Sequence, residues 1–139
     1  MAIYILNVIA KRGHENAVTE LFESSLDKLE QADGFQSRTI YRAKDGLFVE
    51  KVKQMYTKDE LEKMGNQEVP GPDGVHFMIH ENWESPDHRM RYSRADAHKF
   101  TAQLIPHILP EHSHEFYETV SRIRLSASLY RGGFPASEV

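Results

Sequence analysis

The first thirty residues constrain the fold most, because a strand that is apolar on both faces is followed by a helix with one apolar stripe. Residues 3–10 alternate two apolar sets, which predicts a strand covered on both faces and placed near the middle of a sheet. Gly13 ends this strand, and residues 14–31 carry apolar side chains at helical spacing with charged ones between them. One amphipathic helix covers only one face of a sheet. The other face therefore needs a second apolar layer.

The rest of the chain repeats this strand and helix pattern. Residues 34–43 alternate in the manner of a second strand, and residues 75–83 predict a third. Ser85 is placed to cap a helix that starts at Pro86 and runs to about residue 105. Residues 115–124 predict a fourth strand.

Residues 44–74 do not fit this pattern and are interpreted as an insertion. The stretch GLFVEKVKQM, residues 46–55, is compatible with a hairpin continued from the second strand. Residues 57–65, TKDELEKMG, have an N-cap threonine, early acidic residues and a final glycine, which predict a short helix. Residues 69–74, VPGPDG, predict a loop.

The order of elements predicts an α+β fold, a ferredoxin-like sandwich with an antiparallel sheet covered by helices on one face. We expect a single domain over residues 1–124, with the insertion at about 44–74 and a loosely ordered C-terminal tail at 125–139. The apolar residues on the uncovered face predict that two copies pair sheet to sheet as a dimeric α/β barrel.

Composition excludes several classes of protein. The 139 residues carry a formal charge of −4 and no cluster of basic residues, so a nucleic-acid partner is not expected. The absence of cysteine excludes disulfides, thiolate nucleophiles and cysteine-based metal sites, and fits a cytoplasmic location. The apolar start of the chain is too short for a signal peptide or membrane span. No nucleophile elbow, Walker loop or dinucleotide-binding glycine motif is present.

Three stretches resemble the antibiotic biosynthesis monooxygenase family of small dimeric α/β-barrel proteins. They are ADGF at 32–35, MIHENWESPD at 78–87 and AHKF at 97–100. Within the second, Glu81 and Trp83 match the acid-x-Trp pair that ends a strand in that family. The third is similar to a His-Phe element, with Lys99 inserted between its two residues. The resemblance extends from residue 3 to about 123, apart from the insertion.

This resemblance implies a cofactor-independent monooxygenase that acts as a homodimer on a small phenolic, quinol or polyketide-like substrate. Some relatives degrade haem with a first-strand asparagine, a tryptophan and a histidine. Asn7 matches that asparagine, but Tyr92 stands where the tryptophan is expected and no histidine falls at the third position. A competing interpretation is a non-catalytic dimeric ligand-binding or regulatory module, in which the insertion caps the pocket or contacts another protein.

Two residues are candidates for catalysis. Oxygenation without a cofactor requires a general base, hydrogen bonds to the substrate anion and a dry pocket. Asn7, on an otherwise apolar strand face, is a candidate hydrogen-bond donor, although an asparagine satisfied by backbone is an equal alternative. His80 is the candidate base, although a structural histidine is the commoner outcome.

Four more residues are candidates for lining the pocket. Asn82 shares a strand face with His80, whereas Trp83 lies on the opposite, apolar face, where core packing is its default role. Tyr92 and His98 are six residues apart and should not share one helical face, but each could reach a cavity.

No metal site is expected. Three histidines, at 107, 112 and 114, flank two prolines, and their spacing is a weak signal for a ligand set. We therefore predict neither a metal nor another cofactor.

Overall fold

Four strands form one antiparallel sheet in the computed structural model, which describes residues 1–65 and 74–125. The sheet has the order β2-β3-β1-β4, which is that of a ferredoxin-like sandwich, and the predicted α+β fold is confirmed. The strands are β1 (Ala2–Lys11), β2 (Phe35–Arg42), β3 (Gly74–Trp83) and β4 (Ile108–Tyr117).

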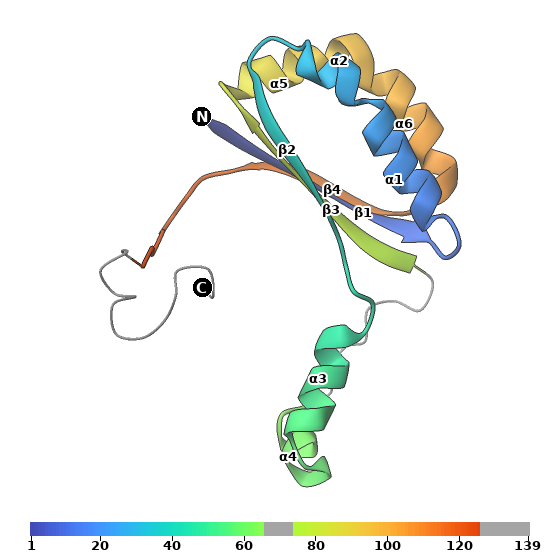
Figure 1. Ribbon diagram of the computed structural model, residues 1–139, viewed down its shortest axis with the longest axis vertical. Helices are drawn as coiled ribbons and strands as arrows, with labels where there is room; N and C mark the ends of the chain where they lie inside the picture. Colours follow the sequence, from blue (N-terminus) through green and yellow to red (C-terminus); the bar gives the residue numbers. More distant parts are fainter. Residues whose placement is uncertain (66–73, 126–139) are drawn as a thin grey trace.

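The helices of the sandwich all lie against the same face of the sheet (Figure 1). They are α1 (Glu15–Ser24), α2 (Leu26–Glu30), α5 (Pro86–Tyr92) and α6 (His98–Leu104), with a π-helical segment, Ser93–Ala97, joining α5 to α6. A short 3-10 helix, Ile105–His107, leads into β4. No helix of the described residues is both long enough and apolar enough to cross a bilayer.

Strand register gives the sheet two chemically different faces. The helix-side face carries Tyr4, Leu6 and Val8 of β1 together with Ile79 and Glu81 of β3. The open face carries the alternate residues, which are Ile3, Ile5, Asn7 and Ile9 of β1, and His76, Met78, His80 and Asn82 of β3. Val8, Phe77 and Ile79 are almost fully buried, whereas Met78 is 39% exposed. Within residues 1–65 and 74–125, no helix covers the open face (Figure 1).

The predicted helix over residues 14–31 is interrupted at Ser25, which separates α1 from α2. The Ser25 hydroxyl donates to the Phe22 carbonyl at 2.7 Å, and Arg38 of β2 donates to the same carbonyl at 3.1 Å. A helix carbonyl that accepts from side chains competes with the regular ladder, which bends or ends the helix.

The glycine of the ADGF corner is required by its backbone and by its neighbour. Gly34 has φ +83°, a left-handed conformation that a residue with a Cβ rarely adopts. A Cβ at this position would lie 2.4 Å from the His88 ring. Its carbonyl accepts from the Glu84 amide at 2.8 Å, so the corner is bonded to the junction between β3 and α5.

The insertion contains two helices, α3 (Leu47–Met55) and α4 (Lys58–Lys63), on an arm that extends beyond the end of the sheet (Figure 1). The hairpin expected at 46–55 is therefore wrong. Gly46, at φ 72°, turns the chain into α3, and Val49 and Val52 share its buried side. The helix predicted at 57–65 is confirmed as α4, with a complete capping box between Thr57 and Glu60. The predicted loop at 69–74 lies outside the described residues except for Gly74, which begins β3.

The last strand begins seven residues earlier than predicted. β4 spans Ile108–Tyr117, whereas residues 118–124 of the expected strand have no regular structure. β4 is a sheet edge, so its mostly exposed residues lack the apolar alternation of a half-buried strand. Pro110 is tolerated there, opposite the register shift between Val8 and Ala10. Most of the predicted tail, residues 126–139, lies outside the described part of the chain.

Candidate functional site

A cavity of about 640 Å³ lies between the helix-side face of the sheet and helices α1, α5 and α6. Its walls are mainly apolar, and charged and hydroxyl groups gather where β1 and β3 meet α5. The lining residues of the sheet are Tyr4, Leu6, Val8, Arg38, Glu81, Ile108, His112, His114, Glu115 and Phe116. Those of the helical layer are Phe22, Ser25, Arg89, Met90, Tyr92, Ser93, His98, Phe100, Thr101, Leu104 and Ile105.

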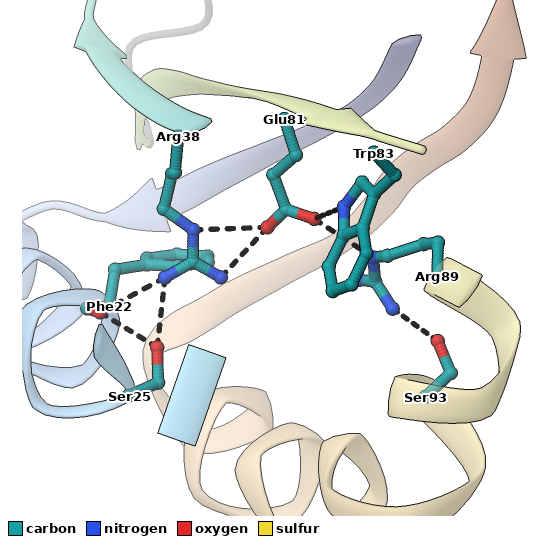
Figure 2. Close-up of polar contacts among 7 residues, drawn as sticks. All are labelled: Phe22, Ser25, Arg38, Glu81, Trp83, Arg89 and Ser93. Atoms are coloured by element: carbon teal, nitrogen blue, oxygen red, sulfur yellow. Dashed lines mark hydrogen bonds and ion pairs between the residues drawn. The ribbon is translucent and has the colours of Figure 1, made fainter. Parts of the chain in front are cut away.

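The polar end of this cavity is built on one buried carboxylate held between two arginines (Figure 2). Arg38 donates through Nε and Nη2 to Glu81 Oε2, at 3.0 and 2.8 Å. Arg89 donates through Nε to Glu81 Oε1 at 2.9 Å. The three side chains are 7%, 1% and 8% exposed, so this is a desolvated network and not a surface ion pair.

Neighbouring groups hold each member of the network in position (Figure 2). The Trp83 indole Nε1 donates to Glu81 Oε1 at 3.0 Å, and Arg38 Nη1 donates to Ser25 Oγ at 2.9 Å. Arg89 Nη1 donates to Ser93 Oγ. The Arg89 guanidinium also lies 4.1 Å from the centre of the Tyr4 ring, within cation–π distance.

Two tyrosines complete the polar end. Burial raises the pKa of the Tyr4 hydroxyl above its ordinary value, although the Arg89 charge opposes this change. Burial likewise raises the pKa of Tyr92, whose ring centre is 5.3 Å from the Arg89 guanidinium. Both hydroxyls therefore stay protonated at neutral pH. They are neutral hydrogen-bond donors in a low-dielectric site.

The structure brings Tyr92 and His98 to this cavity, although they were not expected to share a helical face. The intervening π-helical segment, Ser93–Ala97, changes the angular step between them. Trp83 is fully buried between Phe35 and Tyr92 and does not line the cavity. It supports the site through its bond to Glu81, which agrees with core packing as its default role.

Asn7, His80 and Asn82 lie on the open face, on the other side of the sheet from the cavity. Asn7 contacts His76 Nε2 at 3.0 Å and donates to Ser113 Oγ at 3.3 Å. Asn82 donates to Ser37 Oγ at 2.8 Å. The Nε2 atom of His80 is buried and has no hydrogen-bond partner among the described residues. The two candidate catalytic residues are thus separated from Tyr92 and His98 by the sheet.

The described residues contain no group of three or more histidine, aspartate or glutamate side chains placed to hold a metal ion. His112 and His114 lie on β4, with ring centres 6.1 Å apart at the exposed rim of the cavity. His107 is elsewhere, with its Nδ1 3.0 Å from His14 Nδ1.

Arg38, Glu81 and Arg89 were not among the residues predicted from the sequence to form the site. One signal was available, because Glu81 follows Phe77 and Ile79 on the apolar face of β3. A buried carboxylate requires cationic or hydrogen-bonding partners. Which arginines supply them depends on the packing of β2 and α5 and could not be read from spacing.

Comparison with known proteins identifies relatives of the fold only. No protein-family model matches the sequence, and no curated protein matches it. Among solved structures, the chain is similar to SnoaB, a cofactor-independent oxygenase from Streptomyces nogalater, with a TM-score of 0.58 and 12% identity over 88% of this chain and 96% of that one. It is also similar to an antibiotic biosynthesis monooxygenase, with a TM-score of 0.56 and 13% identity over 87% and 100%.

A third similar structure is Rv0793 from Mycobacterium tuberculosis, with a TM-score of 0.57 and 10% identity over 88% of this chain and 98% of that one. Together these matches confirm that the chain has the fold of the antibiotic biosynthesis monooxygenases. At such low identity the likeness shows the fold alone.

Proposed function

We propose that this chain is a cofactor-independent monooxygenase that oxidises a small phenolic, quinol or polyketide-like substrate in the cavity on the helix-side face. The observation that carries the proposal is the polar end of the cavity, where Arg89, Tyr4 and Tyr92 are available to an oxyanion beside an apolar chamber. The fold that the chain shares with SnoaB, itself a cofactor-independent oxygenase, supports the same activity.

The reaction class suits such a site. A substrate anion can pass an electron directly to O₂ and then combine with it. When the reacting carbon is a methylene, it loses two hydrogens and gains one oxygen atom as a carbonyl, and the second oxygen atom leaves with those hydrogens as water. Donors fixed in a dry cavity stabilise the anion, and the apolar walls keep solvent from the reactive intermediates.

We assign Arg89, Tyr4 and Tyr92 to binding the substrate oxyanion, and His98 to proton transfer at the side of the cavity lined by α6. Asn7 and His80 would have to act through the sheet, so we assign them instead to the open face.

The position of the insertion supports an enzyme over a non-catalytic module. An insertion that filled the cavity would favour a module without activity. The arm formed by residues 44–65 instead points away from α5 and α6, and none of its residues lines the cavity (Figure 1). The haem-degrading alternative receives less support, because Asn7 and Tyr92 lie on opposite sides of the sheet.

We also propose that a second copy of the chain covers the open face, as in the predicted dimeric α/β barrel. Ile3, Ile5 and Ile9 supply apolar area on this face. Asn7 and Asn82 already have hydrogen-bond partners within it, so a partner surface could cover them without leaving them unsatisfied.

Oxygen uptake tests the proposed activity. The purified chain would be assayed in an oxygen electrode with a panel of anthrones and quinols. We expect Arg89→Met to lower kcat/KM by about 10²-fold, as for the loss of an oxyanion donor. Arg91→Met is the matched control, since Arg91 is an exposed arginine of the same helix. Absence of oxygen uptake with every substrate would contradict the proposal, as would an activity that depends on Asn7 but not on Arg89.

A further inference from the structure

The charges at the polar end of the cavity do not balance. Two guanidinium groups, Arg38 and Arg89, face one carboxylate, Glu81. All three nitrogens of Arg38 are used, because Nε and Nη2 bond Glu81 while Nη1 bonds Ser25 Oγ and the Phe22 carbonyl. Arg89 uses only Nε and Nη1, and its Nη2 makes no hydrogen bond within residues 1–65 and 74–125. One positive charge and one donor edge are therefore left for a ligand.

The carboxylate at the same end has no acceptor site left for a ligand proton. Glu81 Oε2 accepts twice from Arg38, and Oε1 accepts from Trp83 and Arg89. A carboxylate has about four lone-pair sites, so Glu81 is saturated. The other titratable side chains near Arg89 are Tyr4 and Tyr92, whose rings lie against its guanidinium and whose hydroxyls can donate to an anion. His98, His112, His114 and Glu115 line the cavity from α6 and β4, and all four are exposed.

The apolar part of the cavity limits the rest of the ligand. Leu6 and Val8 of β1 face Phe22 of α1 and Phe100 and Leu104 of α6. Phe22 and Phe100 form an aromatic pair with ring centres 4.9 Å apart. Such walls favour a planar, unsaturated body and offer it few hydrogen bonds.

We propose that the cavity selects a ligand that is already a monoanion in solution at neutral pH, with a planar apolar body and a delocalised oxyanion that meets Arg89 Nη2. The oxyanion is an acidic phenolate or enolate, or a carboxylate. This inference deepens the proposed function by defining the charge of the substrate. It depends on the proposed function only in placing the substrate in this cavity. It can be tested by binding measurements, without an assay of activity.

The experiment measures dissociation constants by equilibrium dialysis, with three probes of nearly equal shape. They are 4-nitrophenol, its neutral methyl ether 4-nitroanisole, and 4-nitrobenzoate. Each is titrated into the full chain at one pH below and one above the pKa of 4-nitrophenol. We expect 4-nitrophenol to bind roughly tenfold or more tightly above its pKa, because a hydrogen bond to a charged group replaces a neutral one. The ether should bind weakly at both pH values, and the tighter of the two anions identifies the oxyanion class.

Arg89→Met should abolish the preference for the anion over the neutral ether, so that the dissociation constants of 4-nitrophenolate and 4-nitroanisole differ by no more than about twofold. This variant keeps Arg38 paired with Glu81, so the two charges balance, and Glu81 Oε1 keeps its bond from Trp83. Arg89→Lys, which retains the charge, should retain part of the preference, and Arg91→Met should retain all of it. Circular dichroism checks that each variant is folded.

Three results would overturn the inference. One is an ether that binds as tightly as the phenolate, and another is an anion preference that survives in Arg89→Met. The third is the absence of saturable binding by all three probes. These measurements record binding only, and no turnover is required for any probe. A failure here is therefore separate from a failure to detect oxygen uptake.

Discussion

The two faces of the sheet use polar residues in opposite ways. On the helix-side face, Glu81 and two arginines form a charged network that is almost completely buried. On the open face, the neighbouring Asn82 and the nearby Asn7 are neutral and form hydrogen bonds with hydroxyl or imidazole groups. The desolvation of a buried charge is costly and must be offset by several hydrogen bonds, as it is for Glu81. Neutral hydrogen-bonded pairs cost much less to desolvate than charges do. A face that carries such pairs can therefore be covered by another chain.

The largest difference between the two faces should appear in the stability of variants at two adjacent residues of β3. Glu81→Gln removes the carboxylate that serves two buried arginines and should lower the free energy of unfolding by about 3–5 kcal/mol. Asn82→Ala removes one hydrogen bond, to Ser37, and should cost about 1 kcal/mol or less. Urea unfolding followed by Trp83 fluorescence measures both. Equal losses in the two variants would show that the charged network has no special weight in this fold.

The next largest difference should appear in dimer association, between a substitution on the open face and one on an exposed helix. Ile5 lies on the open face, opposite His80 and Glu115 in the neighbouring strands. Ile5→Lys should weaken association by at least about a hundredfold, because each protomer would have to bury a charged side chain in an apolar interface. Sedimentation equilibrium measures the change, with Leu26→Lys on the exposed side of α2 as control. A wild-type chain that is monomeric at micromolar concentration would rule out the dimer.

The smallest difference should appear in the free energy of unfolding at alkaline pH. Tyr4 and Tyr92, on the helix-side face, have pKa values raised above the ordinary 10.0 by burial. Above pH 10 the unfolded chain loses these protons while the folded chain keeps them. The free energy of unfolding therefore falls as pH rises through that window, by at most about 1.4 kcal/mol per pH unit for each tyrosine.

Tyr4→Phe should make this fall shallower, as measured by urea unfolding at a series of alkaline pH values. Tyr41→Phe on the open face keeps both buried tyrosines and should keep the fall. If Tyr4→Phe left the slope unchanged, burial of its hydroxyl would not contribute to it.

Local pattern was enough to predict most of the elements. Periodicity gave the first three strands and the main helices, and the Ser85 cap is confirmed by its bond from the His88 amide. The prediction of secondary structure failed for two elements whose pattern of apolar residues does not indicate the structure that they adopt in the fold. β4 is an edge strand with exposed residues, and α3 has apolar residues that suit a strand as well as a helix.

The site was only partly predictable. Tyr92 and His98 line the cavity, whereas the assignment of Asn7 and His80 assumed that the polar face of β3 would line it. The helices cover the other face instead, because Phe77, Ile79 and Trp83 lose more contact with water there. Glu81 and Arg89 line the cavity because their charged groups are buried beside that apolar set.

The sequence by itself determined the order of the four strands and of the helices of the sandwich, the glycine corner at Gly34 and the two faces of β1 and β3. These are local properties, set by side-chain alternation, capping and backbone conformation. Only the tertiary structure decided that Arg38 and Arg89 meet at Glu81. Three residues from β2, β3 and α5 come together through packing, and spacing along the chain does not encode their distance in space.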